Sequence, residues 1–109
     1  MTKSVSIMGA TGSVGRSALA AIAHANAVSE TGAAFAIDTL TANRDVDALA
    51  GLAIEFNAKL AVIADEACFD SLRNRLGGTG IEVACGPRAL ATAAARPVDR
   101  LVAAIVGIA

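Results

Sequence analysis

Short apolar segments alternate with alanine-rich segments of helical character along the whole chain of 109 residues. The helical spacing is clearest in residues 46–56, where Leu49, Leu52, Ala53 and Phe56 form an i, i+3, i+4, i+7 stripe. We expect strands over residues 4–8, 33–40, 60–64, 81–85 and 101–106, and helices over 14–25, 46–56, 68–76 and from Pro87 onward. Such strands separated by helices are typical of a parallel sheet covered on both sides. The sequence therefore predicts one α/β domain over residues 1–109, with three layers and a mostly parallel sheet.

Composition and charge argue against several classes of protein. With 55% hydrophobic and 17% charged residues, the chain is expected to bury a core rather than remain disordered. A net charge of −1, and three Phe with no Trp or Tyr, give no support for nucleic-acid or anionic-membrane binding. The first residues form too short an apolar stretch for a signal peptide, and the apolar run 101–109 is about half a membrane helix. We therefore expect a soluble, cytoplasmic protein.

The residue types that most often carry chemistry are scattered along the chain. Cys68 and Cys85 belong to no CxxC motif, so we interpret them as buried thiols of a reducing compartment rather than as a disulfide or metal site. Asp65 and Glu66 resemble an acid–base or metal pair, but their position favours capping of the following helix. His24, the one histidine, lies in an alanine-rich helical segment and is interpreted as structural. We expect no catalytic residue and no metal ligand in this chain.

Three glycines follow the first expected strand, at the point where the chain must turn into a helix. They are Gly9, Gly12 and Gly15 of the stretch SIMGATGSVGRSAL. Glycine permits positive φ and lets backbone N–H groups approach a phosphate, and the helix N-terminus adds free donors and partial positive charge. Thr11 and Ser13 add hydroxyl donors, and no lysine follows as a Walker loop would require. A purely structural turn is the alternative, but the position on the first strand favours a dinucleotide site in a Rossmann-like fold.

The end of the second expected strand decides between the two nicotinamide dinucleotides. An acidic residue there would bond the ribose hydroxyls of NAD, whereas this chain reads LTANRDV. The guanidinium of Arg44 is suited to clamp a 2′-phosphate, and Asn43 can supply a further donor. Asp38 is a rival for an NAD role but lies inside the strand, and Asp45 is expected to cap the helix that begins at Val46. The alternative is that Arg44 is an ordinary solvated arginine without a ligand. Because a 2′-phosphate ligand is the favoured role of Arg44, the sequence predicts NADPH rather than NADH.

Four segments occur in an order that carries a family resemblance: SIMGATGSVGRSAL, LTANRDVDAL, AKLAVIADE and VDRLVAAIVGIA. Together they resemble the N-terminal, NADPH-binding part of 1-deoxy-D-xylulose 5-phosphate reductoisomerases, and the resemblance covers essentially the whole chain. The glycine turn is shared with many families, whereas the closing AAIVG after VD is much more specific.

The resemblance implies a set of cofactor-binding residues in three segments. They are Thr11, Gly12, Ser13 and Val14 in the phosphate-binding turn, Asn43, Arg44 and Asp45 in the 2′-phosphate and adenosine loop, and Ala104 and Ile105 beside the nicotinamide side. The family more often has Gly-Lys-Asn in the second segment. The positive charge is kept here as Arg44, whereas Asn43 replaces the glycine and Asp45 replaces the final amide.

The resemblance also implies a parent enzyme larger than this chain. In the family, an Asn-Lys-Glu substrate segment, the Asp and Glu ligands of Mg²⁺ or Mn²⁺, and the substrate phosphate site follow this region. We therefore expect a fragment that binds NADPH without turnover. Its homodimeric parent would isomerise and reduce 1-deoxy-D-xylulose 5-phosphate to 2-C-methyl-D-erythritol 4-phosphate in isoprenoid biosynthesis.

Two other classes share the glycine turn and remain as alternatives. One is the N-terminal domain of a semialdehyde dehydrogenase-like NADP enzyme, which would need a nucleophilic cysteine in a later domain. The surroundings of Cys68 and Cys85 offer no adjacent base that would lower a thiol pKa, which counts against this class here. The other is an NADP-sensing domain without enzymatic activity.

Overall fold

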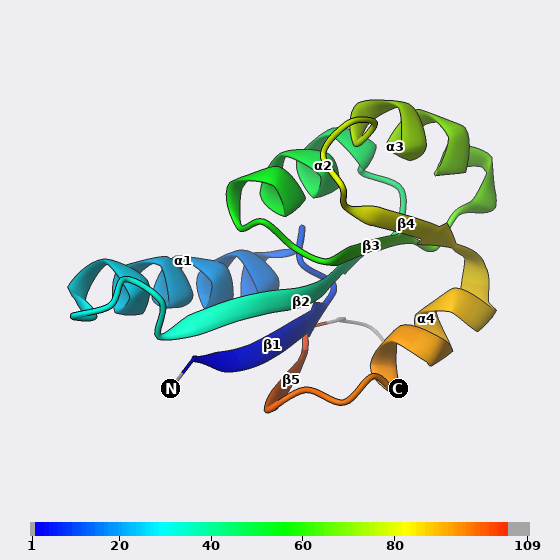
Figure 1. Cartoon of the computed structure of the whole chain (residues 1–109). Coiled ribbons are helices and arrows are strands. Elements are labelled where there is room, and N and C mark those ends of the chain that lie inside the picture. The colour runs from blue at the N-terminus through cyan, green and yellow to red at the C-terminus, as the bar shows by residue number, and fades with distance from the viewer. Residues whose placement is uncertain (1, 105–109) are drawn as a thin grey trace.

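Strands and helices alternate through residues 2–104, the part of the chain that the computed structural model describes (Figure 1). The strands are β1 (Lys3–Met8), β2 (Phe35–Ala42), β3 (Leu60–Ile63), β4 (Glu82–Cys85) and β5 (Arg100–Ala103). The helices are α1 (Ser13–Val28), α2 (Val46–Glu55), α3 (Phe69–Arg75) and α4 (Gly86–Ala94), and the 3₁₀ turn η1 (Glu66–Cys68) precedes α3. Each of these strands and α-helices was expected from the sequence, with ends that shift by a few residues. The expected last strand extends to Val106, which lies outside the described residues.

The five strands are parallel and form one sheet in the order β4-β3-β2-β1-β5. Helices α1, α2 and α3 cover one face of this sheet, and α4 lies on the opposite face (Figure 1). This distribution follows from the right-handed crossover rule, because the chain adds three strands in one direction and then reverses to place β5 beyond β1. The three-layer, Rossmann-like α/β prediction is therefore confirmed.

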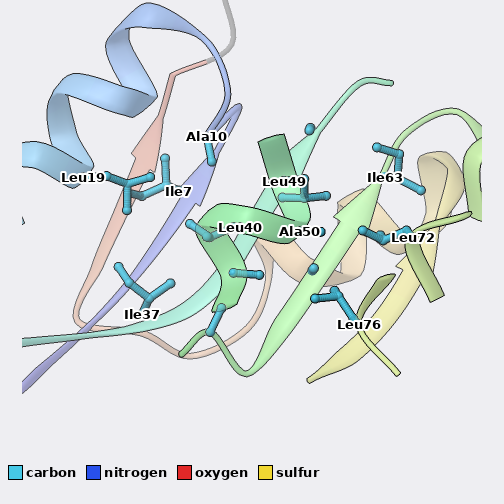
Figure 2. Packing of buried hydrophobic residues seen from close by; sticks show 14 of the residues in the cluster. Ile7, Ala10, Leu19, Ile37, Leu40, Leu49, Ala50, Ile63, Leu72 and Leu76 are labelled. Atoms are coloured by element: carbon cyan, nitrogen blue, oxygen red, sulfur yellow. The ribbon is translucent and has the colours of Figure 1, made fainter. Parts of the chain in front are cut away.

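The larger part of the core lies between the sheet and the first three helices (Figure 2). Ile7 and Leu40 from β1 and β2 pack there with Leu19 of α1, Leu49 of α2 and Leu72 of α3, all at most 2% exposed. A smaller cluster fills the other face, where Met8, Leu60 and Val62 meet Ala93 of α4. The alternation of these two sets along β1 and β3 is the period-two pattern of a strand covered on both sides.

One ion pair joins the middle of β2 to Arg96, two residues after the end of α4. Arg96 donates two hydrogen bonds to Asp38, with Nε–Oδ2 and Nη2–Oδ1 distances of 2.7 and 3.1 Å. The Thr39 hydroxyl donates a third bond to Oδ2 at 2.9 Å. The bonds from Arg96 hold the pKa of Asp38 below its ordinary value, although burial acts in the opposite direction. Asp38 is thus a structural carboxylate whose oxygens are already engaged, and it does not serve as the acidic ligand of a ribose.

We expect Asp38→Asn to lower the free energy of unfolding by about 2 kcal/mol at neutral pH, because the substitution breaks a bidentate pair in which the carboxylate is buried and the guanidinium is partly exposed. A carboxylate whose pKa is lowered in the folded state stabilises the protein above its unfolded-state pKa, and this contribution disappears as the pH falls through the folded-state pKa. The difference between wild type and variant should therefore shrink below about pH 4 in urea unfolding series.

Asp70→Asn is the matched control, because Asp70 pairs with Arg73 on the exposed surface of α3 at 3.3 Å. We expect a change of less than about 0.5 kcal/mol for this variant. A difference between Asp38→Asn and wild type that stays constant from pH 7 to pH 3 would contradict the assignment of the effect to the Asp38 carboxylate.

Candidate cofactor site

The strand order reverses between β1 and β5. Along the chain, β2, β3 and β4 add successively to one side of β1, whereas β5 lies on its other side. In open parallel sheets, ligands bind outside the carboxyl ends of the strands at such a reversal. The three segments predicted to bind a cofactor follow β1, β2 and β5, which are neighbours in the sheet. The fold therefore brings all three to one edge.

The three glycines of the turn after β1 have three different environments. Gly9 has φ +90°, a conformation that favours glycine. A Cβ on Gly15 would lie 2.2 Å from the carbonyl oxygen of Gly9 and 2.7 Å from Cα of Ala10, so α1 approaches the turn too closely for any side chain. Gly12 has ordinary extended backbone, and a Cβ there would meet only the Gly9 oxygen, at 3.8 Å. The glycine spacing predicts the same roles for all three residues, whereas the structure shows a different environment for each.

Gly12 is the glycine that the fold itself does not require. A dinucleotide-binding turn uses one glycine for the turn, one for close helix packing and one so that the pyrophosphate can reach the backbone. Gly9 and Gly15 meet the first two needs, and exposed Gly12 is left for the third.

The start of α1 is open to an anion. Gly12, Ser13 and Val14 are exposed, and within this described helix no side chain caps the N-terminus and no acidic residue lies in the first turn. The first N–H groups of a helix have no intrahelical partner and carry partial positive charge. The Arg16 side chain donates to the Thr11 carbonyl oxygen at 2.9 Å, which places another positive charge beside the turn. The arrangement can bind a phosphate group.

The loop after β2 presents Asn43 and Arg44 to solvent. Asp45 caps α2, as expected from the sequence, and its carboxylate accepts from the backbone N–H of Ala48 at 3.1 Å. The Asn43 carbonyl oxygen accepts from the N–H of Asp65 at 3.0 Å, so the loop is fixed to the end of β3. Among the described residues Arg44 forms no ion pair, which leaves its guanidinium available for a ligand.

Arg44 also lines a pocket of about 530 Å³ between the start of α2 and α3. Ser71, Asn74 and Arg75 of α3 line the same pocket, and no local sequence pattern predicts them as part of a site. Arg75 forms an ion pair with Asp47, an acidic residue in the first turn of α2. Arg75 thus offsets the negative charge of Asp47, which lines the same pocket as the positively charged Arg44.

The third predicted segment lies against the turn after β1. Ala104 is 6% exposed, and its N–H donates to the carbonyl oxygen of Met8 at 2.8 Å. Met8 immediately precedes Gly9, so this contact places the end of β5 beside the glycine turn. Ile105, the other predicted residue of this segment, lies outside the described residues.

The remaining candidates take structural positions. Asp65 accepts from the N–H of Ala67 at 3.0 Å and caps the 3₁₀ turn η1. The sequence predicts a cap of the following helix itself, but α3 begins only after η1, and no side chain of the described residues caps its N-terminus. His24 is exposed on α1, and Cys68 and Cys85 are free and partly buried. Within residues 2–104, no three His, Cys, Asp or Glu side chains are grouped so that they could hold a metal ion. The helices in this part of the chain are also too short or too polar to cross a membrane.

The chain matches the family model described as 1-deoxy-D-xylulose 5-phosphate reductoisomerase over residues 5–109. It belongs to this family. A reductoisomerase of Rhodopseudomonas palustris strain BisA53 is 43% identical over 107 residues, and one of Rhodospirillum centenum is 45% identical over the same length. Each alignment covers 98% of this chain and 25% of the relative. The chain thus spans about a quarter of the length of these curated reductoisomerases.

Solved reductoisomerase structures share the fold. The enzyme of Zymomonas mobilis in complex with NADPH superposes with a TM-score of 0.89 at 39% identity, covering 98% of this chain and 27% of that one. A complex of a reductoisomerase with NADPH, fosmidomycin and magnesium gives a TM-score of 0.82 at 31% identity, covering 94% of this chain and 24% of that one. Membership of the reductoisomerase family does not favour the semialdehyde dehydrogenase or the NADP-sensing alternative.

Proposed function

We propose that this chain is the NADPH-binding domain, residues 1–109, of a 1-deoxy-D-xylulose 5-phosphate reductoisomerase. The observation that carries the proposal is Gly12, whose lack of a side chain is needed neither by the backbone conformation nor by the packing of α1. It stands at an uncapped, exposed helix N-terminus, where a pyrophosphate would gain N–H donors and a favourable dipole. Membership of the reductoisomerase family and the NADPH complex of the Zymomonas mobilis enzyme support the same cofactor.

In this proposal the three segments divide the cofactor among them. Thr11, Gly12, Ser13 and Val14 bind the pyrophosphate through backbone N–H and hydroxyl groups. Asn43, Arg44 and Asp45 form the 2′-phosphate and adenosine end, where Arg44 supplies the positive charge and Asp45 holds the start of α2. Ala104 and Ile105 are assigned to the nicotinamide side of the cofactor, and the nicotinamide supplies a hydride when the cofactor is bound.

The whole protein, in this proposal, isomerises 1-deoxy-D-xylulose 5-phosphate and reduces the product to 2-C-methyl-D-erythritol 4-phosphate in isoprenoid biosynthesis. Its substrate-binding residues and its Mg²⁺ or Mn²⁺ site would lie outside these 109 residues. The reductoisomerase complexes with magnesium and with fosmidomycin support a metal-assisted reaction on a small phosphorylated substrate. We further propose a cytoplasmic homodimer, in keeping with the sequence-based expectation.

Arg44→Gln tests the cofactor assignment. We expect the Kd for NADPH to rise about tenfold, because the variant loses one charge-assisted contact to the 2′-phosphate. The Kd for NADH, which has no 2′-phosphate, should change less than twofold. Both constants are read from nicotinamide fluorescence titrations of the purified protein.

Arg73→Gln is the matched control, because Arg73 is an exposed arginine of α3 that pairs with Asp70 and does not line the Arg44 pocket. It should leave both constants unchanged. Equal losses for NADPH and NADH in Arg44→Gln would remove Arg44 from the 2′-phosphate site, and a wild-type protein that binds neither cofactor would overturn the proposed function.

A further inference from the structure

Thr41, the penultimate residue of β2, forms two hydrogen bonds with the glycine turn after β1. Its hydroxyl oxygen accepts from the N–H of Gly9 at 2.9 Å, and its carbonyl oxygen accepts from the N–H of Ala10 at 2.8 Å. Thr41 is 2% exposed and Ala10 is fully buried, whereas Gly9 is only partly buried. The side-chain bond is additional to the backbone pairing of β1 with β2 and depends on the residue type at position 41.

The two bonds from Thr41 hold Gly9 and Ala10, where the turn, as far as the structure describes the chain, has only one long hydrogen bond of its own. Within the turn, the N–H of Gly12 reaches the oxygen of Gly9 at a long 3.4 Å. Gly9 has φ +90°, and glycine in this region has more conformational freedom than any other residue. A partner for its N–H therefore restricts the orientation of the peptide groups that lead to Gly12. The same bond directs the Gly9 N–H toward β2. Among the residues that the structure describes, no side chain caps the N–H groups at the start of α1, and they can meet a ligand.

Thr41 also directly precedes the loop that carries Arg44. Ala42 and Asn43 hold that loop on its other side, since their carbonyl oxygens accept from Ala64 and Asp65 at 2.9 and 3.0 Å. The loop is thus anchored to the end of β3 by backbone bonds, whereas the glycine turn is anchored to β2 through Thr41. The Thr41 hydroxyl thus adds a side-chain bond to the backbone bonds that set the position of the turn relative to the loop.

We propose that Thr41 is a positioning residue that sets the spacing between the pyrophosphate turn and the 2′-phosphate loop; this inference rests on the proposed function. A ligand that engages both segments gains affinity when the turn is already held at the distance that the ligand spans. A ligand that engages only the loop after β2 gains nothing from the Thr41 hydroxyl.

Thr41→Val and Thr41→Ser separate the hydroxyl from the rest of the side chain. Valine keeps the shape and the β-branch but has no acceptor for the Gly9 N–H, and serine keeps the acceptor. For Thr41→Val we expect the Kd for NADPH to rise about fivefold. The Kd for adenosine 2′-monophosphate, which carries the 2′-phosphate without the pyrophosphate, should stay within twofold. Thr41→Ser should bind both ligands as the wild type does.

The experiment combines titrations of NADPH and adenosine 2′-monophosphate with amide hydrogen exchange at Gly9, which should accelerate in Thr41→Val and stay slow in Thr41→Ser. Wild-type affinity for NADPH in Thr41→Val, or equal losses for the two ligands, would overturn the inference, because the second result indicates a general loss of structure. A wild-type protein that binds no NADPH overturns the proposed function itself. A wild type that binds NADPH while Thr41→Val binds it equally well overturns only the role of Thr41.

Discussion

Gly15→Ala is expected to lower the free energy of unfolding by about 3 kcal/mol. The new Cβ would lie 2.2 Å from the oxygen of Gly9 and under 3.0 Å from two backbone atoms of Ala10. Backbone atoms of a turn cannot rotate away as the end of a flexible side chain can, so α1 must move off the sheet. That movement opens the core contact that Leu19 makes with β1 and β2. The higher helix propensity of alanine relative to glycine offsets only about 1 kcal/mol of this loss.

Gly51→Ala is the control, because Gly51 is an exposed glycine inside α2 and a Cβ there would meet nothing within 4 Å. The same substitution should stabilise the protein by up to about 1 kcal/mol through helix propensity alone. Urea unfolding followed by circular dichroism measures both variants. If Gly15→Ala were as stable as Gly51→Ala, α1 would not pack against the glycine turn as closely as described.

The elements of this fold were predictable because the signals that set them are local. The apolar strands, the helical stripe in residues 46–56 and the capping position of Asp45 are all encoded within a few residues, and the structure contains each of them. The end of β2 was less predictable. The strand runs to Ala42 rather than to Leu40, because Thr41 and Ala42 pair with Val62 and Ile63 of β3, about twenty positions away in the sequence.

Contacts between distant segments account for the parts of the site that the sequence did not predict. The carboxylate of Asp38 is engaged by Arg96, 58 residues further along the chain, so its unsuitability as a ribose ligand is a tertiary effect. The separate roles of the glycines have the same origin. Gly15 is restricted by the carbonyl of Gly9 and by Ala10, and Gly12 is distinguished by the absence of such a neighbour. The spacing of the glycines in the sequence therefore does not predict which of them is needed for packing and which is open to a ligand.

Gly12→Ala is expected to leave the fold intact and to raise the Kd for NADPH about thirtyfold. The backbone of Gly12, with φ −79° and ψ 172°, is open to any residue, and the nearest atom to a new Cβ lies at 3.8 Å. Alanine is a poorer N-cap than glycine, which costs at most about 1 kcal/mol of stability. The methyl group would instead stand at the exposed start of α1, in the space that the proposed function gives to the pyrophosphate.

The two glycine variants together distinguish a structural turn from a ligand site. A turn with only a structural role would make Gly15→Ala unstable and leave Gly12→Ala without consequence for any ligand. If the turn binds a pyrophosphate, Gly15→Ala should lower stability and Gly12→Ala should weaken cofactor binding. The reason is that helix packing excludes a side chain at Gly15, whereas the ligand excludes one at Gly12. NADPH titration and urea unfolding of both variants measure the two responses. A folded Gly12→Ala protein with wild-type affinity for NADPH would remove the observation on which the proposed function depends.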